Sequence, residues 1–85
     1  MENELYNFEV VDRNSFVTFI DMLHKDLIEN PDDWENVNLL DFLEAFSAYA
    51  ESIQNYYDNM KIDIDADKPS WRTFADIFLG AKVYE

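Results

Sequence analysis

The chain has 85 residues and a mass of 10.1 kDa, which allows one small domain spanning residues 1–85 and leaves no room for a second. Nineteen acidic residues stand against six basic ones, so the net charge is −13, while 48% of the residues are hydrophobic, which favours a folded domain over disorder. So acidic a chain lacks the clustered Lys and Arg that bind nucleic-acid phosphates, and it is repelled by anionic membrane surfaces.

Several other classes of protein are excluded by what the chain lacks. It contains no cysteine, so disulfides, thiol catalysis and zinc–thiolate sites are absent. Its apolar runs are too short to cross a membrane, and the start of the chain, Met1 to Glu4, has none of the features of a signal peptide. We therefore expect a cytoplasmic protein that contacts neither nucleic acid nor membrane directly.

The first predicted element is an extended segment at residues 5–11, where apolar and polar side chains alternate with a period of two. Residues 61–65 alternate in the same way, and a short two-stranded ribbon between the two segments would satisfy both.

A first helix is predicted over residues 13–30, with Asp12 as its N-cap. The Asn30-Pro31 step ends it, because proline disfavours helical geometry in the residue before it. The apolar residues of this segment recur at helical spacing and fall on one face: Phe16, Phe19, Ile20, Leu23 and Leu27.

A second helix is predicted over residues 39–60, capped by Asn38 and with Asp41 in its first turn, where a negative charge suits the helix dipole. A third is predicted over residues 71–84, capped by Ser70. This third segment is apolar nearly all round, which is typical of a helix that is central to a fold or part of an interface. The elements together predict an all-α fold, a compact three-helix bundle with an extended N-terminal segment packed across it.

Single residues and short motifs favour structural roles. The run Asp63-x-Asp65-x-Asp67 opens like a calcium-binding EF-hand loop, but Lys68 stands where that loop needs a glycine. His24, the single histidine, is interpreted as a half-buried structural residue. Gly80, the single glycine, indicates close packing by another element.

The two tryptophans, Trp34 and Trp71, each stand beside a predicted helix start and are expected to anchor the ends of the bundle. No catalytic residue, no metal ligand set and no cofactor site is predicted.

Three short motifs occur in a fixed order: Trp34-Glu35-Asn36, the Phe-Leu-Glu-Ala run at 42–45, and the Pro-Ser-Trp-Arg-x-Phe-Ala run at 69–75. In these motifs the chain resembles a family of small acidic bacterial proteins of unknown function, over roughly residues 8–85. The resemblance implies a stand-alone cytosolic bacterial protein and transfers no catalytic residue. The family pattern has a Trp near position 49, where this chain has Tyr49.

The uneven charge suggests where a partner would bind. Residues 26–67 carry twelve acids and only Lys61, a net charge of −11, whereas the last eighteen residues are nearly neutral. We expect a non-enzymatic protein-binding module whose acidic helix face attracts a basic protein, for example as an immunity-type inhibitor that imitates nucleic-acid phosphates in the cleft of a nuclease toxin. The residues predicted to form that surface are Asp32, Asp33, Glu35, Asp41, Glu44, Glu51 and Asp58.

Two alternatives follow from other features of the sequence. The apolar segment 71–84 would serve as the contact between subunits of a homo-oligomer. The central carboxylates would be the metal ligands of a metal-assisted hydrolase.

Overall fold

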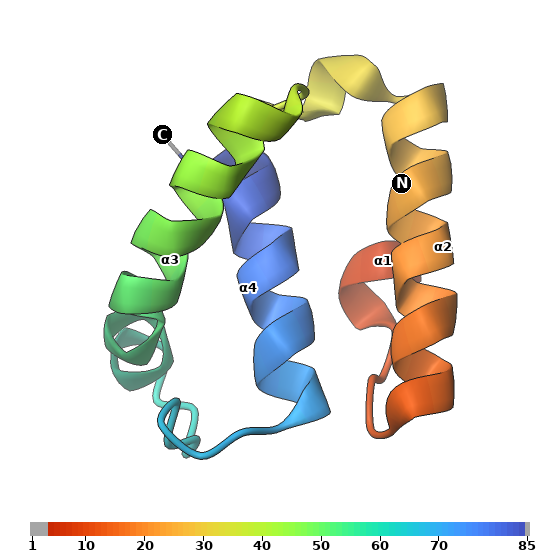
Figure 1. Cartoon of the computed structure of the whole chain (residues 1–85). Helices are drawn as coiled ribbons and strands as arrows, with labels where there is room; N and C mark the ends of the chain where they lie inside the picture. Colours follow the sequence, from red (N-terminus) through yellow and green to blue (C-terminus); the bar gives the residue numbers. More distant parts are fainter. Residues whose placement is uncertain (1–3, 85) are drawn as a thin grey trace.

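The computed structural model describes residues 4–84, and within them it contains helices and no strand. The elements in chain order are α1 (Glu4–Asn7), α2 (Arg13–Glu29), the short 3-10 helix η1 (Pro31–Asp33), α3 (Leu39–Asn59) and α4 (Trp71–Val83) (Figure 1). The predicted all-α fold is therefore confirmed. Each of the three long helices begins where the sequence predicted and ends one residue earlier.

The three long helices begin at the residues predicted to cap them. The carboxylate of Asp12 accepts a hydrogen bond from the Ser15 backbone N–H, and the Ser15 hydroxyl accepts one from the Asp12 N–H, which makes a reciprocal capping box. The side chain of Asn38 accepts the N–H of Asp41 in the same way, and that of Ser70 accepts the N–H of Thr73. These caps satisfy backbone donors that the first turn of a helix leaves free.

The C-terminal end of α3 forms a Schellman motif without a glycine. The N–H of Ile62 donates to the carbonyl of Tyr57, and the N–H of Lys61 donates to that of Asp58. This geometry places Lys61 in the left-handed region, with φ of 58°, a conformation that costs a non-glycine residue roughly 1 kcal/mol.

The predicted two-stranded ribbon is wrong. Residues 4–7 form α1, and Leu5 is buried in the core. Residues 61–65 instead belong to a turn held by the side chain of Gln54, which donates to the carbonyl of Ile64 and accepts the N–H of Ala66. The side-chain amide of Gln54 thus makes the hydrogen bonds to the backbone that a neighbouring strand would have made.

Helix α4 occupies the centre of the fold, between α2 and α3 (Figure 1). Its Phe78 ring meets rings from both neighbours, with centroid distances of 5.9 Å to Phe16 of α2 and 4.8 Å to Phe46 of α3. Trp71 packs on Phe16 at 5.3 Å. The apolar character of this helix all round is thus explained by its central position.

The single glycine allows a side chain of α3 to pack directly against the backbone of α4. A Cβ atom added to Gly80 would overlap the ring of Tyr49, which lies against the glycine. The Tyr49 ring also makes an edge-to-face contact with Tyr84, with the centroids 5.5 Å apart. The prediction that Gly80 marks close packing is confirmed.

A buried ion pair joins the C-terminal end of α4 to α2. The Lys82 ammonium lies 3.0 Å from a carboxylate oxygen of Asp26, and both side chains are more than 90% buried. The indole N–H of Trp34 donates to Asp26 at 2.9 Å, and the amide of Asn30 donates to its other oxygen at 3.1 Å. Lys82 in turn donates to the hydroxyl of Tyr6 at 3.1 Å.

The surroundings of the pair favour both charges. Burial by itself raises the pKa of Asp26, but hydrogen bonds from Lys82, Trp34 and Asn30 outweigh it and hold that pKa below its ordinary value. Burial likewise lowers the pKa of Lys82, and its hydrogen bonds to Tyr6 and Asp26 outweigh that effect and raise it. Two aromatic rings, of Tyr6 and Trp34, lie about 5 Å from the ammonium.

Within residues 4–84, no helix is both long enough and apolar enough to cross a membrane.

Replacing Asp26 by Asn should lower the free energy of unfolding by about 3–5 kcal/mol, because it leaves the Lys82 charge buried without a counter-charge. Urea denaturation at pH 7 measures this, with Asp63→Asn on an exposed turn as the matched control, expected within about 0.5 kcal/mol of wild type. The double variant Asp26→Leu/Lys82→Met should be more stable than Asp26→Asn, since it leaves no buried charge.

The same ion pair determines how the stability of the protein changes at acidic pH. Because the pKa of Asp26 is lowered by folding, its contribution is present above about pH 4, the ordinary range for Asp, and is lost as the pH falls through its lower folded value. The stability difference between wild type and Asp26→Asn should therefore shrink below pH 4. An equal difference at pH 7 and pH 3 would contradict this assignment.

Substituting Gly80 by Ala should destabilise the protein by about 1–3 kcal/mol, because the added methyl group meets the Tyr49 ring. In a Tyr49→Ala background the same change should stabilise by up to about 1 kcal/mol, since Ala is the better helix former. Thermal unfolding of wild type, Gly80→Ala, Tyr49→Ala and the double variant checks whether the effect of the alanine at position 80 reverses in sign. The same loss in both backgrounds would show that Tyr49 is not the obstacle.

Candidate functional site

The seven carboxylates predicted to bind a partner are all exposed. Asp32 and Asp33 lie in η1, Glu35 follows in the loop to α3, and the other four lie on α3 itself. Glu44, Glu51 and Asp58 recur every seven residues and therefore form one outward stripe along that helix.

The structure gathers three of the seven at one place and spreads the others. Glu35, Asp41 and Glu44 line a hollow of about 460 Å³ beside Tyr84, at the N-terminal end of α3. Glu51 lies about 10 Å further along α3, and Asp58 about 20 Å, at 1.5 Å of rise per residue. On and beside α3, the predicted face thus consists of one acidic cluster at the start of the helix and of two further carboxylates, Glu51 and Asp58, along the same helix. Below, the acidic surface means the seven carboxylates together.

Little within the chain neutralises this surface. Among residues 4–84 the ion pairs are Lys82–Asp26 and Arg72–Asp76, and neither includes a carboxylate of the acidic surface. Asp41 accepts a hydrogen bond from the Asn38 side chain and Asp58 accepts one from Gln54. These neutral donors leave the net negative charge in place.

An apolar groove lies between α2 and α3, next to the acidic surface. Its volume is about 310 Å³, and Phe78 of α4 and Trp34 also line it. Apart from His24, Asn36 and Asn38 its lining is apolar. The two helices contribute the residues of its walls, Ile20, Leu23 and Leu27 from α2, and Leu39 and Phe42 from α3, with Val37 from the loop. We call this the α2–α3 groove.

The loop that contributes Trp34, Asn36 and Val37 to the groove is fixed to α4. The backbone N–H groups of Glu35 and Asn36 both donate to the carbonyl of Lys82, and the Asn36 amide donates to the carbonyls of Ala81 and Tyr84. Together with the Trp34–Asp26 hydrogen bond, these contacts hold residues 34–36 in place. The groove is therefore formed by the fold before any partner arrives.

The residues that the sequence offered as candidates for chemistry, His24 and the three aspartates at 63, 65 and 67, are all exposed. His24 is exposed on α2, where it lines the groove, so the prediction of a half-buried histidine is wrong. Asp63, Asp65 and Asp67 are exposed on the turn before α4, and within residues 4–84 no three His, Cys, Asp or Glu side chains gather as metal ligands would.

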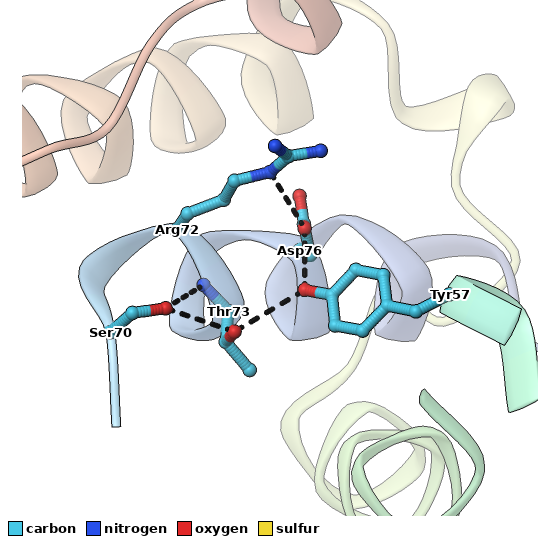
Figure 2. Close-up of polar contacts among 5 residues, drawn as sticks. All are labelled: Tyr57, Ser70, Arg72, Thr73 and Asp76. Carbon is cyan, nitrogen blue, oxygen red and sulfur yellow. Dashed lines mark hydrogen bonds and ion pairs between the residues drawn. The ribbon is translucent and has the colours of Figure 1, made fainter. Parts of the chain in front are cut away.

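The other polar cluster of note joins α3 to α4 and is shown in Figure 2. The fully buried Tyr57 donates to the Asp76 carboxylate at 2.7 Å, and Asp76 also meets Arg72 at 3.5 Å. The Ser70 hydroxyl bonds the hydroxyl and the backbone N–H of Thr73. Ser70 is thus engaged as a helix cap, with no base among the groups it contacts.

Burial raises the pKa of Tyr57 well above its ordinary value, and the adjacent Asp76 carboxylate raises it further. The phenol therefore stays protonated and acts as a hydrogen-bond donor. Because the buried Tyr57 of α3 bonds Asp76 of α4, we interpret this cluster as a structural link between the two helices.

Neither the groove nor the buried ion pair was predicted from the sequence. The signal for the groove is the pair of apolar residues Val37 and Leu39 on either side of the helix cap Asn38. The pairing of Lys82 with Asp26 had no local signal, because the two residues are 56 positions apart.

The Tyr57→Phe variant should lose about 1.5–3 kcal/mol of stability, the range for a hydrogen bond to a charged group. The neighbouring Tyr56→Phe variant is the control, because Tyr56 is exposed, and it should stay within about 0.5 kcal/mol of wild type. Chemical denaturation measures both. Equal stability of the two variants would show that the Tyr57 hydroxyl does not stabilise the contact between α3 and α4.

Comparison with known proteins gives a family and no function. Residues 12–85 match the model of a family described as a family of unknown function, DUF7660. Neither a curated protein nor a solved structure matches the chain. The matched range contains α2, α3 and α4, and with them the acidic surface and the groove. Because the match covers most of the chain, the protein belongs to this family of unknown function, DUF7660.

Proposed function

We propose that this protein is a binding module that recognises a basic protein through its acidic surface. The observation that carries the proposal is the exposure of all seven carboxylates, none of which is neutralised by an ion pair among residues 4–84. A net charge of −13 on so small a domain also creates a long-range field that attracts cationic surfaces. An inhibitor that occupies a phosphate-binding cleft is the most specific form of this proposal.

The field acts mainly on the rate of encounter and on the choice of partner. Charges at the rim of an interface accelerate association and lose that effect in salt, whereas the final affinity depends on the groups buried at its centre. The cluster of Glu35, Asp41 and Glu44 would therefore orient the incoming partner at the N-terminal end of α3.

The alternatives have less support. Helix α4, the candidate contact for a homo-oligomer, lies between α2 and α3 and uses most of its apolar surface there. For a metal-assisted hydrolase, the carboxylates of the acidic surface are spread along α3. Those that do gather, Glu35, Asp41 and Glu44, border an open hollow without a histidine.

The test compares two variants that each remove three negative charges. Glu35→Gln/Glu44→Gln/Glu51→Gln changes the acidic surface, and Asp63→Asn/Asp65→Asn/Asp67→Asn changes the turn before α4. Tagged proteins are used to capture partners from a lysate of the source cells in about 50 mM and 500 mM salt, and the captured proteins are identified by mass spectrometry.

We expect a basic protein that is retained by wild type and by the turn variant at low salt only. Titration calorimetry with that purified partner should show about tenfold weaker binding for the acidic-surface variant, since an exposed charge pair contributes about 0.2–1 kcal/mol. Binding that persists in 500 mM salt, or that falls equally in both variants, would exclude the acidic surface as the determinant.

A further inference from the structure

We infer that the α2–α3 groove receives an amphipathic helix of the basic partner, with apolar side chains in the groove and Lys or Arg side chains against the acidic residues that flank it. This inference rests on the proposed function and specifies which part of the partner is recognised. It is drawn from the shape of the groove, the exposed apolar residues around it and the charge of its flanks.

The groove has the properties of a preformed binding site. Its volume of about 310 Å³ lies at the lower end of the range of about 300–1,000 Å³ found for ligand pockets. The Trp34 indole at one end is fixed by its hydrogen bond to Asp26, and Phe78 is fixed by the aromatic rings of α2 and α3. The groups that a partner would contact are therefore already ordered, which lowers the entropy lost on binding.

Apolar side chains are exposed in and around this groove. Val37 and Leu39 line it and are still 52% and 71% exposed, and Leu43 and Ile28 are more than half exposed on the same two helices. Nothing in residues 4–84 covers them. A concentration of exposed apolar side chains beside a groove is typical of an interaction surface.

The charge around the groove indicates the chemistry of the occupant. Between residues 20 and 44 there are eight acidic residues and one lysine, and of the acids only Asp26 is held in an ion pair. Asn36 lines both this groove and the hollow bordered by Glu35, Asp41 and Glu44, so the carboxylates of that hollow lie beside the groove. A basic segment is complementary to these flanks. A second copy of this chain would instead bring like charges together.

The apolar walls favour a helix over an extended peptide. A helix satisfies its own backbone N–H and C=O groups, so it can rest on apolar walls without leaving polar groups unpaired. An extended peptide needs backbone partners, and residues 4–84 offer no sheet edge to supply them. Apolar residues at positions i, i+4 and i+7 of a helix would lie along the groove.

The test uses a displayed library of 16-residue helical peptides, with Leu, Ile, Phe, Met or Ala on one face and Lys, Arg, Glu or Gln on the flanks. The library is selected on the full chain. Enriched peptides are synthesised with a fluorescent label, and their binding to wild type and variants is measured by fluorescence anisotropy.

Two leucines in the first turn of α3 give a matched pair of variants. Leu39→Ser removes an exposed leucine that lines the groove, and Leu40→Ser removes a more exposed one, at 81%, that does not. Circular dichroism and thermal unfolding are used to check that both variants fold. We expect enriched peptides with net positive flanks, unchanged affinity for Leu40→Ser and at least tenfold weaker binding to Leu39→Ser.

Four results with the peptides or with the protein alone would overturn the inference. They are a selection that enriches no peptide, enriched peptides with neutral or acidic flanks, equal affinity for the two leucine variants, and a dimer of the protein alone that dissociates in Leu39→Ser during sedimentation. If the basic partner identified above binds wild type and Leu39→Ser equally but is lost from the acidic-surface variant, the groove inference fails while the proposed function stands.

Discussion

The ion pair between Lys82 and Asp26 is the interaction on which the rest of the structure depends. It joins the last turn of α4 to the last turns of α2 in the interior, and it is completed by Trp34 from the loop after η1 and by Tyr6 from α1. Four parts of the chain therefore meet at one pair of charges. An unpaired charge there would cost several kcal/mol, so the pair stabilises the arrangement in which these four parts of the chain meet.

The same cluster determines the geometry of the candidate site. With Trp34 bonded to Asp26, and with Asn36 bonded to the end of α4, the loop between η1 and α3 crosses from one helix to the other in a fixed conformation. That loop joins the ends of α2 and α3, and α4 lies between these helices and contacts both (Figure 1). Residues of the same loop, Trp34 and Asn36 to Asn38, line the α2–α3 groove. The Tyr57–Asp76 link holds the far end of α3 against α4 in a similar way.

The surface joins two features that separately have ordinary explanations. Exposed carboxylates keep a small domain soluble, and scattered exposed leucines are common on protein surfaces. Here Glu35, Asp41 and Glu44 border a hollow that shares Asn36 with the apolar groove, so electrostatic attraction and apolar burial would act on the same partner. In such an interface the charges govern encounter and selectivity, while the side chains buried in the groove supply most of the affinity.

The sequence by itself determined the local structure. Asp12, Asn38 and Ser70 specified the helix starts, the helical spacing of apolar residues gave the fold class, and Gly80 indicated a close contact, because each of these depends on residues a few positions apart or on a single backbone requirement. The sequence also placed the carboxylates on the surface, since ionised groups stay in water unless they are paired. Only the tertiary structure decided that Lys82 pairs with Asp26, that Gln54 replaces a strand partner, and that α2 and α3 leave a groove between them. These features depend on contacts between distant residues, and hydrophobic periodicity shows which face of a helix is buried without showing which helix covers it.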